Sequence, residues 1–96
     1  MAKTIRLRVL TAQGLAIDTD TTAIRAPGEL GSLGMLYNHA PLVTTLSPGT
    51  LTWRTPEGGR LRASLGFGIL EVVKNQVTIL TDRVSEPSAA PTGREL

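Results

Sequence analysis

The sequence predicts an all-β protein: a small β-sandwich of about eight to ten short strands with a disordered C-terminal tail. Three observations lead to this prediction. Apolar and polar residues alternate with a period of two, Gly- and Pro-containing turns separate the alternating segments, and no segment long enough for a helix has a helical period. With 96 residues, the chain has room for one domain.

The first half of the chain is expected to form four strands, at residues 5–9, 15–17, 21–24 and 43–46. In the first strand, Ile5, Leu7 and Val9 fall on one face and polar residues fall on the other. The third is a β-branched run, and the fourth is closed by a Ser-Pro-Gly turn. Residues 26–34, rich in glycine, are expected to be irregular.

The second half has clearer strand signals. Residues 50–54 and 60–65 alternate on either side of a Pro-Glu-Gly-Gly turn, which predicts a hairpin. Residues 66–73 are apolar at both alternating sets of positions, which favours a strand buried between layers. A Lys-Asn turn and a return strand at residues 76–81 follow.

The last segment, residues 85–96, is polar and contains two prolines. It offers little apolar surface to bury, so a disordered tail is expected after a sandwich domain at residues 4–84. The chain has no apolar run of the length that a signal peptide or a spanning helix requires. A cytoplasmic location, or a site on a membrane complex reached from the cytoplasm, is therefore expected.

The residue inventory disfavours an enzyme. The chain has no cysteine and a single histidine, His39, with no serine or acid at a recognisable motif spacing. Gly28, Gly31 and Gly34 are spaced by three, but neither the helix nor the lysine of a phosphate-binding loop accompanies them. No catalytic residue, metal site or cofactor is predicted.

Charged residues leave two readings open. Asp18 and Asp20 are compatible with a calcium pair, although a solvated turn is the commoner meaning of such a spacing. Arginines lie at outward positions of two strands: Arg6 and Arg8 in one, Arg60 and Arg62 in the other. These arginines form either a solvated sheet face or one basic face for an acidic partner. A small β-barrel that binds nucleic acid is one alternative function, and another kind of interaction module is the other. The nucleic-acid alternative is the weaker one, because such proteins stack bases on aromatic side chains and this chain has three aromatic residues in all.

A block at residues 28–49 resembles the β-domain of one family, the ε subunit of F-type ATP synthases. Its Gly-x-x-Gly spacing and its His-Ala-Pro-Leu-x-Thr-x-Leu-x-Pro-Gly run, residues 39–49, fit the family pattern. Residues 68–72 and 75–82 resemble two further family blocks, and the whole resemblance covers residues 4–84. Tyr37-Asn38 replaces a Pro-Gly pair and Gly66-Phe67 a Ser-Gly pair.

The resemblance implies a non-catalytic rotor subunit of the central stalk, which binds the γ subunit and the ring of c subunits and helps couple ion translocation to ATP synthesis. It implies a peripheral position on the cytoplasmic face of the bacterial inner membrane, with no nucleic acid as partner. Family members commonly continue into a helical hairpin that this sequence lacks, so neither an inhibitory arm nor ATP binding is expected. The γ-facing residues carried over are Thr11, His39, Ala40, Pro41, Leu42 and Thr44. The ring-facing residues carried over are Glu29, Leu30, Gly31, Ser32 and Leu33.

Overall fold

The structure, a computed structural model, describes residues 3–91 and contains only strands and turns, which confirms the all-β prediction. Ten strands run in the order β1 (Ile5–Thr11), β2 (Gly14–Thr21), β3 (Ala23–Gly28), β4 (Gly31–Met35), β5 (Leu42–Leu46), β6 (Gly49–Arg54), β7 (Arg60–Leu65), β8 (Gly68–Val73), β9 (Gln76–Thr81) and β10 (Ser88–Ala89).

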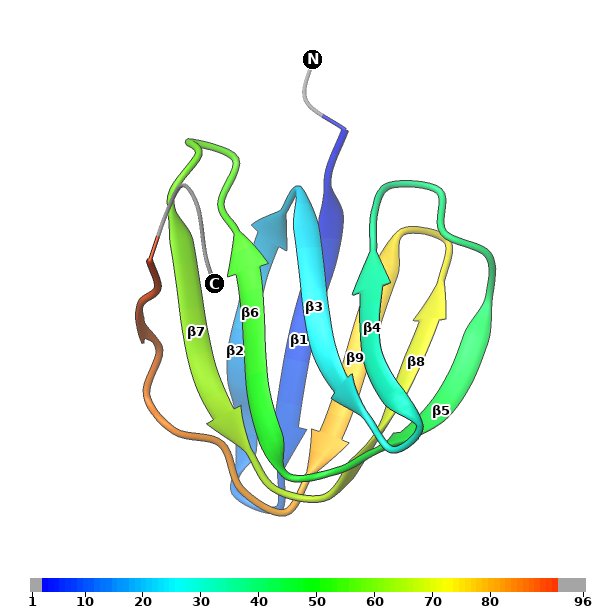
Figure 1. The fold of residues 1–96 in the computed structure, drawn as a ribbon, viewed down its shortest axis with the longest axis vertical. Helices are drawn as coiled ribbons and strands as arrows, with labels where there is room; N and C mark the ends of the chain where they lie inside the picture. Colours follow the sequence, from blue (N-terminus) through cyan, green and yellow to red (C-terminus); the bar gives the residue numbers. More distant parts are fainter. Residues whose placement is uncertain (1–2, 92–96) are drawn as a thin grey trace.

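The strands fold into two facing layers (Figure 1). The front sheet contains β7, β6, β3 and β4, with β10 at its outer edge, and the back sheet contains β2, β1, β9, β8 and β5. A single residue pair, Gly28 with Leu46, joins β3 to β5 and makes the two layers one continuous curled sheet. The N-terminal strand β1 lies parallel to β9 in the back sheet, so the first strand and the last long strand are neighbours in one layer.

The core lies between the layers, and the alternation seen in the sequence fills it. Ile5, Leu7 and Val9 of β1 are completely buried, as are Leu70 of β8 and Ile79 of β9. The front sheet contributes Ile24, Met35, Leu51, Trp53 and Leu65 from the opposite side. Burial of alternate side chains on each inner face is the arrangement that stabilises a two-layer sandwich.

Residues 26–34, expected to be irregular, instead form a tight hairpin. Gly28 pairs with Gly31 and leaves Glu29 and Leu30 as a two-residue turn between β3 and β4. Gly31 has a φ of 136°, a conformation open to glycine, and a side chain on Gly28 would press into the Gly31 carbonyl oxygen. The glycines that suggested a loop are therefore what permits the turn.

The segment after residue 84 also differs from the expectation of disorder. Ser85 donates a backbone hydrogen bond to Ser64, Ser88 and Ala89 pair with β7 as β10, and Ala90 is buried. The ordered domain therefore extends to residue 91, because β7 is an edge strand with unpaired backbone groups that an extended segment can satisfy. The rest of the expected tail, residues 92–96, lies outside the described residues.

Candidate interaction surfaces

The His39 side chain is positioned by the backbone and not by a catalytic partner. Its Nδ1 lies 2.7 Å from the carbonyl oxygen of Ala40, and its backbone N–H donates to Leu36 at 3.1 Å. Among residues 3–91 there is no group of three or more His, Cys, Asp or Glu able to hold a metal ion. Nothing helical in the same residues is long and apolar enough to cross a membrane.

The turn that presents His39 owes its shape to Asn38. Asn38 has a φ of 69°, the left-handed conformation that glycine adopts most easily and asparagine tolerates best among other residues. The backbone N–H of Asn38 donates to the side-chain oxygen of Asn75 at 2.6 Å. The Tyr37-Asn38 pair thus supplies a left-handed residue before His39, and the turn is tied to the β8–β9 connection.

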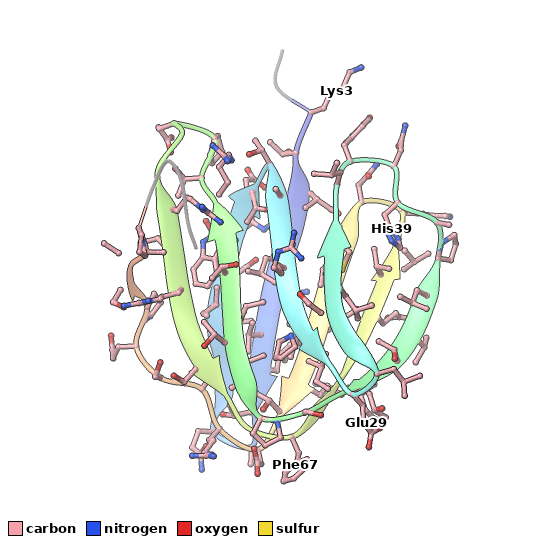
Figure 2. The ribbon with its side chains drawn as sticks, in the orientation of Figure 1. Lys3, Glu29, His39 and Phe67 are labelled. Carbon is pink, nitrogen blue, oxygen red and sulfur yellow. The ribbon has the colours of Figure 1, made fainter. Side chains whose placement is uncertain are left out.

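The structure brings only part of the expected γ-facing set together. His39, Ala40 and Pro41 are consecutive in the turn before β5 at the upper end of the sandwich, where Figure 2 labels His39. Leu42 and Thr44 alternate with outward-facing Val43, so they lie on the inner face of β5. Thr11 ends β1 beside the Leu10–Leu80 pair, at the end of the sandwich opposite to Asn75 and the His39 turn. In addition, β9 and β8 separate its strand from β5. Thr11 is therefore not a neighbour of the His39 turn, although both belong to the γ-facing set carried over from the family.

An apolar stripe on the outward face of the back sheet is the main feature that sequence reasoning missed. It consists of Leu10, Leu80, Ile69 and Val43, which come from β1, β9, β8 and β5. Leu10 pairs with Leu80, and Leu80 pairs with Ile69. Val43 is a diagonal neighbour of Ile69, because it lies opposite Glu71 and Thr45 lies opposite Ile69. The exposed fractions of Val43, Leu80 and Ile69 are 67%, 55% and 49%. We expected residues 66–73 to form a strand buried on both faces, but the outward side chains of β8 are exposed.

The tip of the β3–β4 hairpin contains the expected ring-facing residues. Leu30 is fully exposed, whereas Leu33 is half-buried and packs against the core. Of the two leucines in the ring-facing set, only Leu30 is thus an exposed apolar side chain, because the alternation of β4 turns Leu33 inward. Glu29 is anchored to β5: its backbone N–H donates to the Thr45 carbonyl at 3.1 Å, and its carboxylate accepts the Thr45 hydroxyl at 2.5 Å.

Phe67, in the β7–β8 turn, is a second exposed apolar residue at the hairpin end of the molecule, with 66% of its surface exposed. Figure 2 shows Phe67 and Glu29 at the lower end, opposite Lys3 and His39. The residue pairs Gly28–Leu46 and Leu46–Gly68 put the two turns about two strand spacings apart, on the order of 10 Å. The lower end therefore presents Leu30 and Phe67 together.

The arginines do not form one basic face. Arg6 makes ion pairs with Asp18 at 2.8 Å and with Asp20 at 3.1 Å across the β1–β2 pair of the back sheet. The hydrogen bond from Arg6 lowers the pKa of Asp18, and the same contacts raise the pKa of Arg6. Asp18 and Asp20 are thus partners of an arginine and not a calcium pair. Arg60 and Arg62 belong to the front sheet, where Arg60 lies opposite Arg54, and Thr52 separates Arg62 from Arg25.

Comparison with known proteins decides the family. Residues 4–87 match the model of the ATP synthase delta/epsilon chain β-sandwich domain. The chain belongs to this family. It is 42% identical over 79 residues to the ATP synthase epsilon chains of Stenotrophomonas maltophilia and of Xanthomonas euvesicatoria, and these matches cover 82% of the chain. They cover 56% of the relatives, so the chain spans little more than half of the length of these epsilon chains.

Solved structures of ATP synthases contain the same fold. A chain in the Euglena gracilis mitochondrial ATP synthase, from a structure of its OSCP, F1 and c-ring, superposes with a TM-score of 0.82 at 22% identity. That match covers 91% of this chain and 55% of the other chain. A chain of the Tetrahymena thermophila central stalk and c-ring superposes with a TM-score of 0.70 at 18% identity, covering 84% and 65% of the two chains.

Proposed function

We propose that this chain is a non-catalytic rotor subunit of an F-type ATP synthase, which binds the γ subunit and the c-ring and transmits torque between them. The observation that carries the proposal is that a member of the epsilon family exposes apolar side chains in two separate places, the stripe on the back sheet and the lower end. Apolar patches on a small soluble domain mark sites that a partner covers. A subunit that binds both γ and the c-ring requires two such surfaces, one for each partner.

The γ-facing surface is assigned to the His39 turn, residues 39–41, together with the apolar stripe. The turn leads directly into β5, whose outward residue Val43 is the outermost member of the stripe, so turn and stripe adjoin. The hydrogen bonds of Asn38 to Asn75 hold the turn in one conformation before binding. A preformed surface loses less conformational entropy when a partner binds, which favours affinity.

The ring-facing surface is assigned to the hairpin tip, Glu29–Leu30, with Phe67 beside it. Leu30 projects fully into solvent from a two-residue turn, which is the shortest and stiffest connection that a hairpin allows. The two hydrogen bonds between Glu29 and Thr45 of β5 fix the tip on the body of the sandwich. A stiff tip of this kind can transmit a lateral force without bending away.

The proposal includes the cellular setting. An epsilon-type subunit with these partners resides on the cytoplasmic face of the bacterial inner membrane, held there by the complex. Its contribution to coupling is mechanical, and no chemical step is assigned to its residues.

Two charged substitutions test the two surfaces separately. Ala40→Glu places a charge in the exposed His39 turn, and Leu30→Glu places one at the hairpin tip. Ala89→Glu, on exposed β10, is the matched control. Ala40→Glu is expected to weaken γ binding about 30-fold or more, the effect of an interface hot spot of about 2 kcal/mol. Leu30→Glu is expected to leave γ binding intact and to lower proton-driven ATP synthesis in vesicles that contain the assembled complex.

The two assignments fail independently. Normal γ binding by Ala40→Glu would refute the His39 turn as part of the γ surface, and Ile69→Glu would then test the stripe alone. ATP synthesis at the wild-type rate with Leu30→Glu would refute the ring-facing assignment. If the Ala89→Glu control lost γ binding and ATP synthesis as well, the added charge itself, and not its position, would have caused the effects.

A further inference from the structure

Four apolar side chains lie in one straight row across the outward face of the back sheet. Leu10 of β1 is opposite Leu80 of β9, and Leu80 is opposite Ile69 of β8. On its other side, Leu10 is opposite Leu15 of β2, which is 47% exposed. Because neighbouring strands lie about 4.8 Å apart, this apolar row is about 14 Å long. It contains three members of the apolar stripe and adds Leu15 at the end farthest from the His39 turn.

A β-bulge brings Leu15 into the apolar row. Strict alternation along β2 would put Leu15 on the same face as Ile17, which is buried in the core. The register of the β1–β2 pair shifts between Val9 and Leu10, so that Ile17 lies opposite Val9 and Leu15 lies opposite Leu10. A bulge re-aims the side chains beside it, and Leu15 is exposed here. The apolar row therefore continues past β1 and spans four strands.

A polar row runs beside the apolar row, two residues away along the same strands. Arg8 of β1 is opposite Thr78 of β9, and Thr78 is opposite Glu71 of β8. Arg8 lies 3.8 Å from the carboxylate of Asp18 on β2. Glu71 is exposed and forms no ion pair within residues 3–91. The surface thus combines an apolar row with a parallel polar row that ends in an unpaired acid.

The direction and spacing of the apolar row determine which kind of segment fits it. The row crosses the face of the sheet, so a further strand that pairs at a sheet edge would not cover it. A helix laid along the row presents one apolar residue per turn of about 5.4 Å, close to the distance of about 4.8 Å between strands. An extended segment presents a side chain to one face only every 6.7 Å or so, roughly, and matches the four positions poorly.

We propose that the apolar row binds an amphipathic helix of the γ subunit, about three turns long or longer, which lies across β2, β1, β9 and β8. The inference rests on the proposed function, which supplies γ as the partner, and adds the form and direction of the γ segment and Leu15 as a contact. Apolar residues of the helix, spaced three or four apart, cover the row. Its polar flank faces Arg8, Thr78 and Glu71, with a basic residue opposite Glu71.

Cross-linking in the assembled complex tests the form of the γ segment. A photo-reactive amino acid is placed singly at Leu15, Leu80, Ile69 and Val43, and mass spectrometry identifies the γ residues that it captures. A helix advances about 1.5 Å per residue and a strand about 3.3 Å. The partners of Leu15 and Ile69 are therefore expected to lie about ten residues apart in γ, with the partner of Leu80 between them. A separation of about four residues would indicate an extended segment and overturn the proposal. Cross-links to unconnected parts of γ, or from Val43 alone, would also overturn it, while leaving γ as the partner.

A charge at the far end of the apolar row provides a binding test. Leu15→Glu is expected to weaken γ binding about tenfold or more, although three strands separate β2 from β5 and the His39 turn. Gln13→Glu adds the same charge at an exposed position in the β1–β2 turn and is expected to bind γ normally. Normal γ binding by Leu15→Glu, or equal losses in the two variants, would overturn the proposal. An absence of γ cross-links from all four positions, together with normal γ binding by Ala40→Glu, would refute the γ surface of the proposed function as well.

Discussion

Asn38 and Asn75 hold each other in left-handed conformations across 37 residues of sequence. Asn75 accepts a hydrogen bond from the Asn38 backbone N–H at 2.6 Å and donates one from its Nδ2 to the Asn38 side-chain oxygen at 3.2 Å. Their φ angles are 69° and 62°. This pair connects the His39 turn to the β8–β9 turn, so the proposed γ-facing turn is built by two segments that are distant in the chain.

Substitutions at Asn75 separate two contributions of this pair to stability: its hydrogen bonds and the left-handed backbone conformation of residue 75. Asn75→Ala removes both side-chain hydrogen bonds and places at positive φ a residue that tolerates the left-handed conformation less well than asparagine, so the unfolding free energy is expected to fall by about 2 kcal/mol. Asn75→Gly removes the same hydrogen bonds without the backbone strain, and the loss is expected to be about half as large. Chemical denaturation of both variants measures the difference. Equal losses would show that the left-handed conformation of residue 75 costs little.

The segment after β9 is expected to contribute to stability. Ala90 is buried and its N–H donates to the Arg60 carbonyl at 3.0 Å, whereas neighbouring Ala89 is exposed. Ala90→Asp is therefore expected to lower the unfolding free energy by about 1–3 kcal/mol, the cost of burying a poorly partnered polar group. Ala89→Asp, the matched control, is expected to remain within about 0.5 kcal/mol of the wild type. Similar values for the two variants would mean that this segment does not pack on β7 in solution.

Acid should weaken the β1–β2 pair through Asp18. The hydrogen bond from Arg6 lowers the pKa of Asp18 in the folded chain below its ordinary value. A lowered pKa gives stability that is present above the ordinary carboxyl pKa and is lost as the pH falls through the lowered one. Asp18→Asn is thus expected to flatten the acid limb of a stability-against-pH curve. Thermal melts of both chains from neutral pH downward measure this, and an unchanged acid limb would contradict it.

Two glycines in strands should respond differently to alanine. A Cβ on Gly68 would collide with the backbone of β9 at Leu80 and Thr81. A Cβ on Gly34 would meet only the end of the Arg25 side chain at 3.9 Å. Gly68→Ala is expected to destabilise the domain by about 1–3 kcal/mol, as overpacking does, while Gly34→Ala leaves stability nearly unchanged. Denaturant midpoints compare the two, and the prediction is wrong if Gly68→Ala melts with the wild type.

Some features of the fold were predictable because their causes are local. The burial of Ile5, Leu7 and Val9 follows from a period of two, which any half-buried strand imposes. The hairpin of β6 and β7 follows from alternation on both sides of a turn rich in glycine. The His-Ala-Pro-Leu run identified the family resemblance, and the match over residues 4–87 confirmed it. Each of these signals lies within a short stretch of chain.

The candidate surfaces depended on which strands became neighbours, and the sequence pattern does not contain that information. Alternation shows that Arg6 and Arg60 point away from the core, but only the strand order places Arg6 against Asp18 and Arg60 opposite Arg54. Strand β5 pairs along its length with β8 of the back sheet and contacts the front sheet only through the Gly28–Leu46 pair. The sequence determined which side chains face outward, and the tertiary structure decided which of them meet, because strand pairing joins segments that are far apart along the chain.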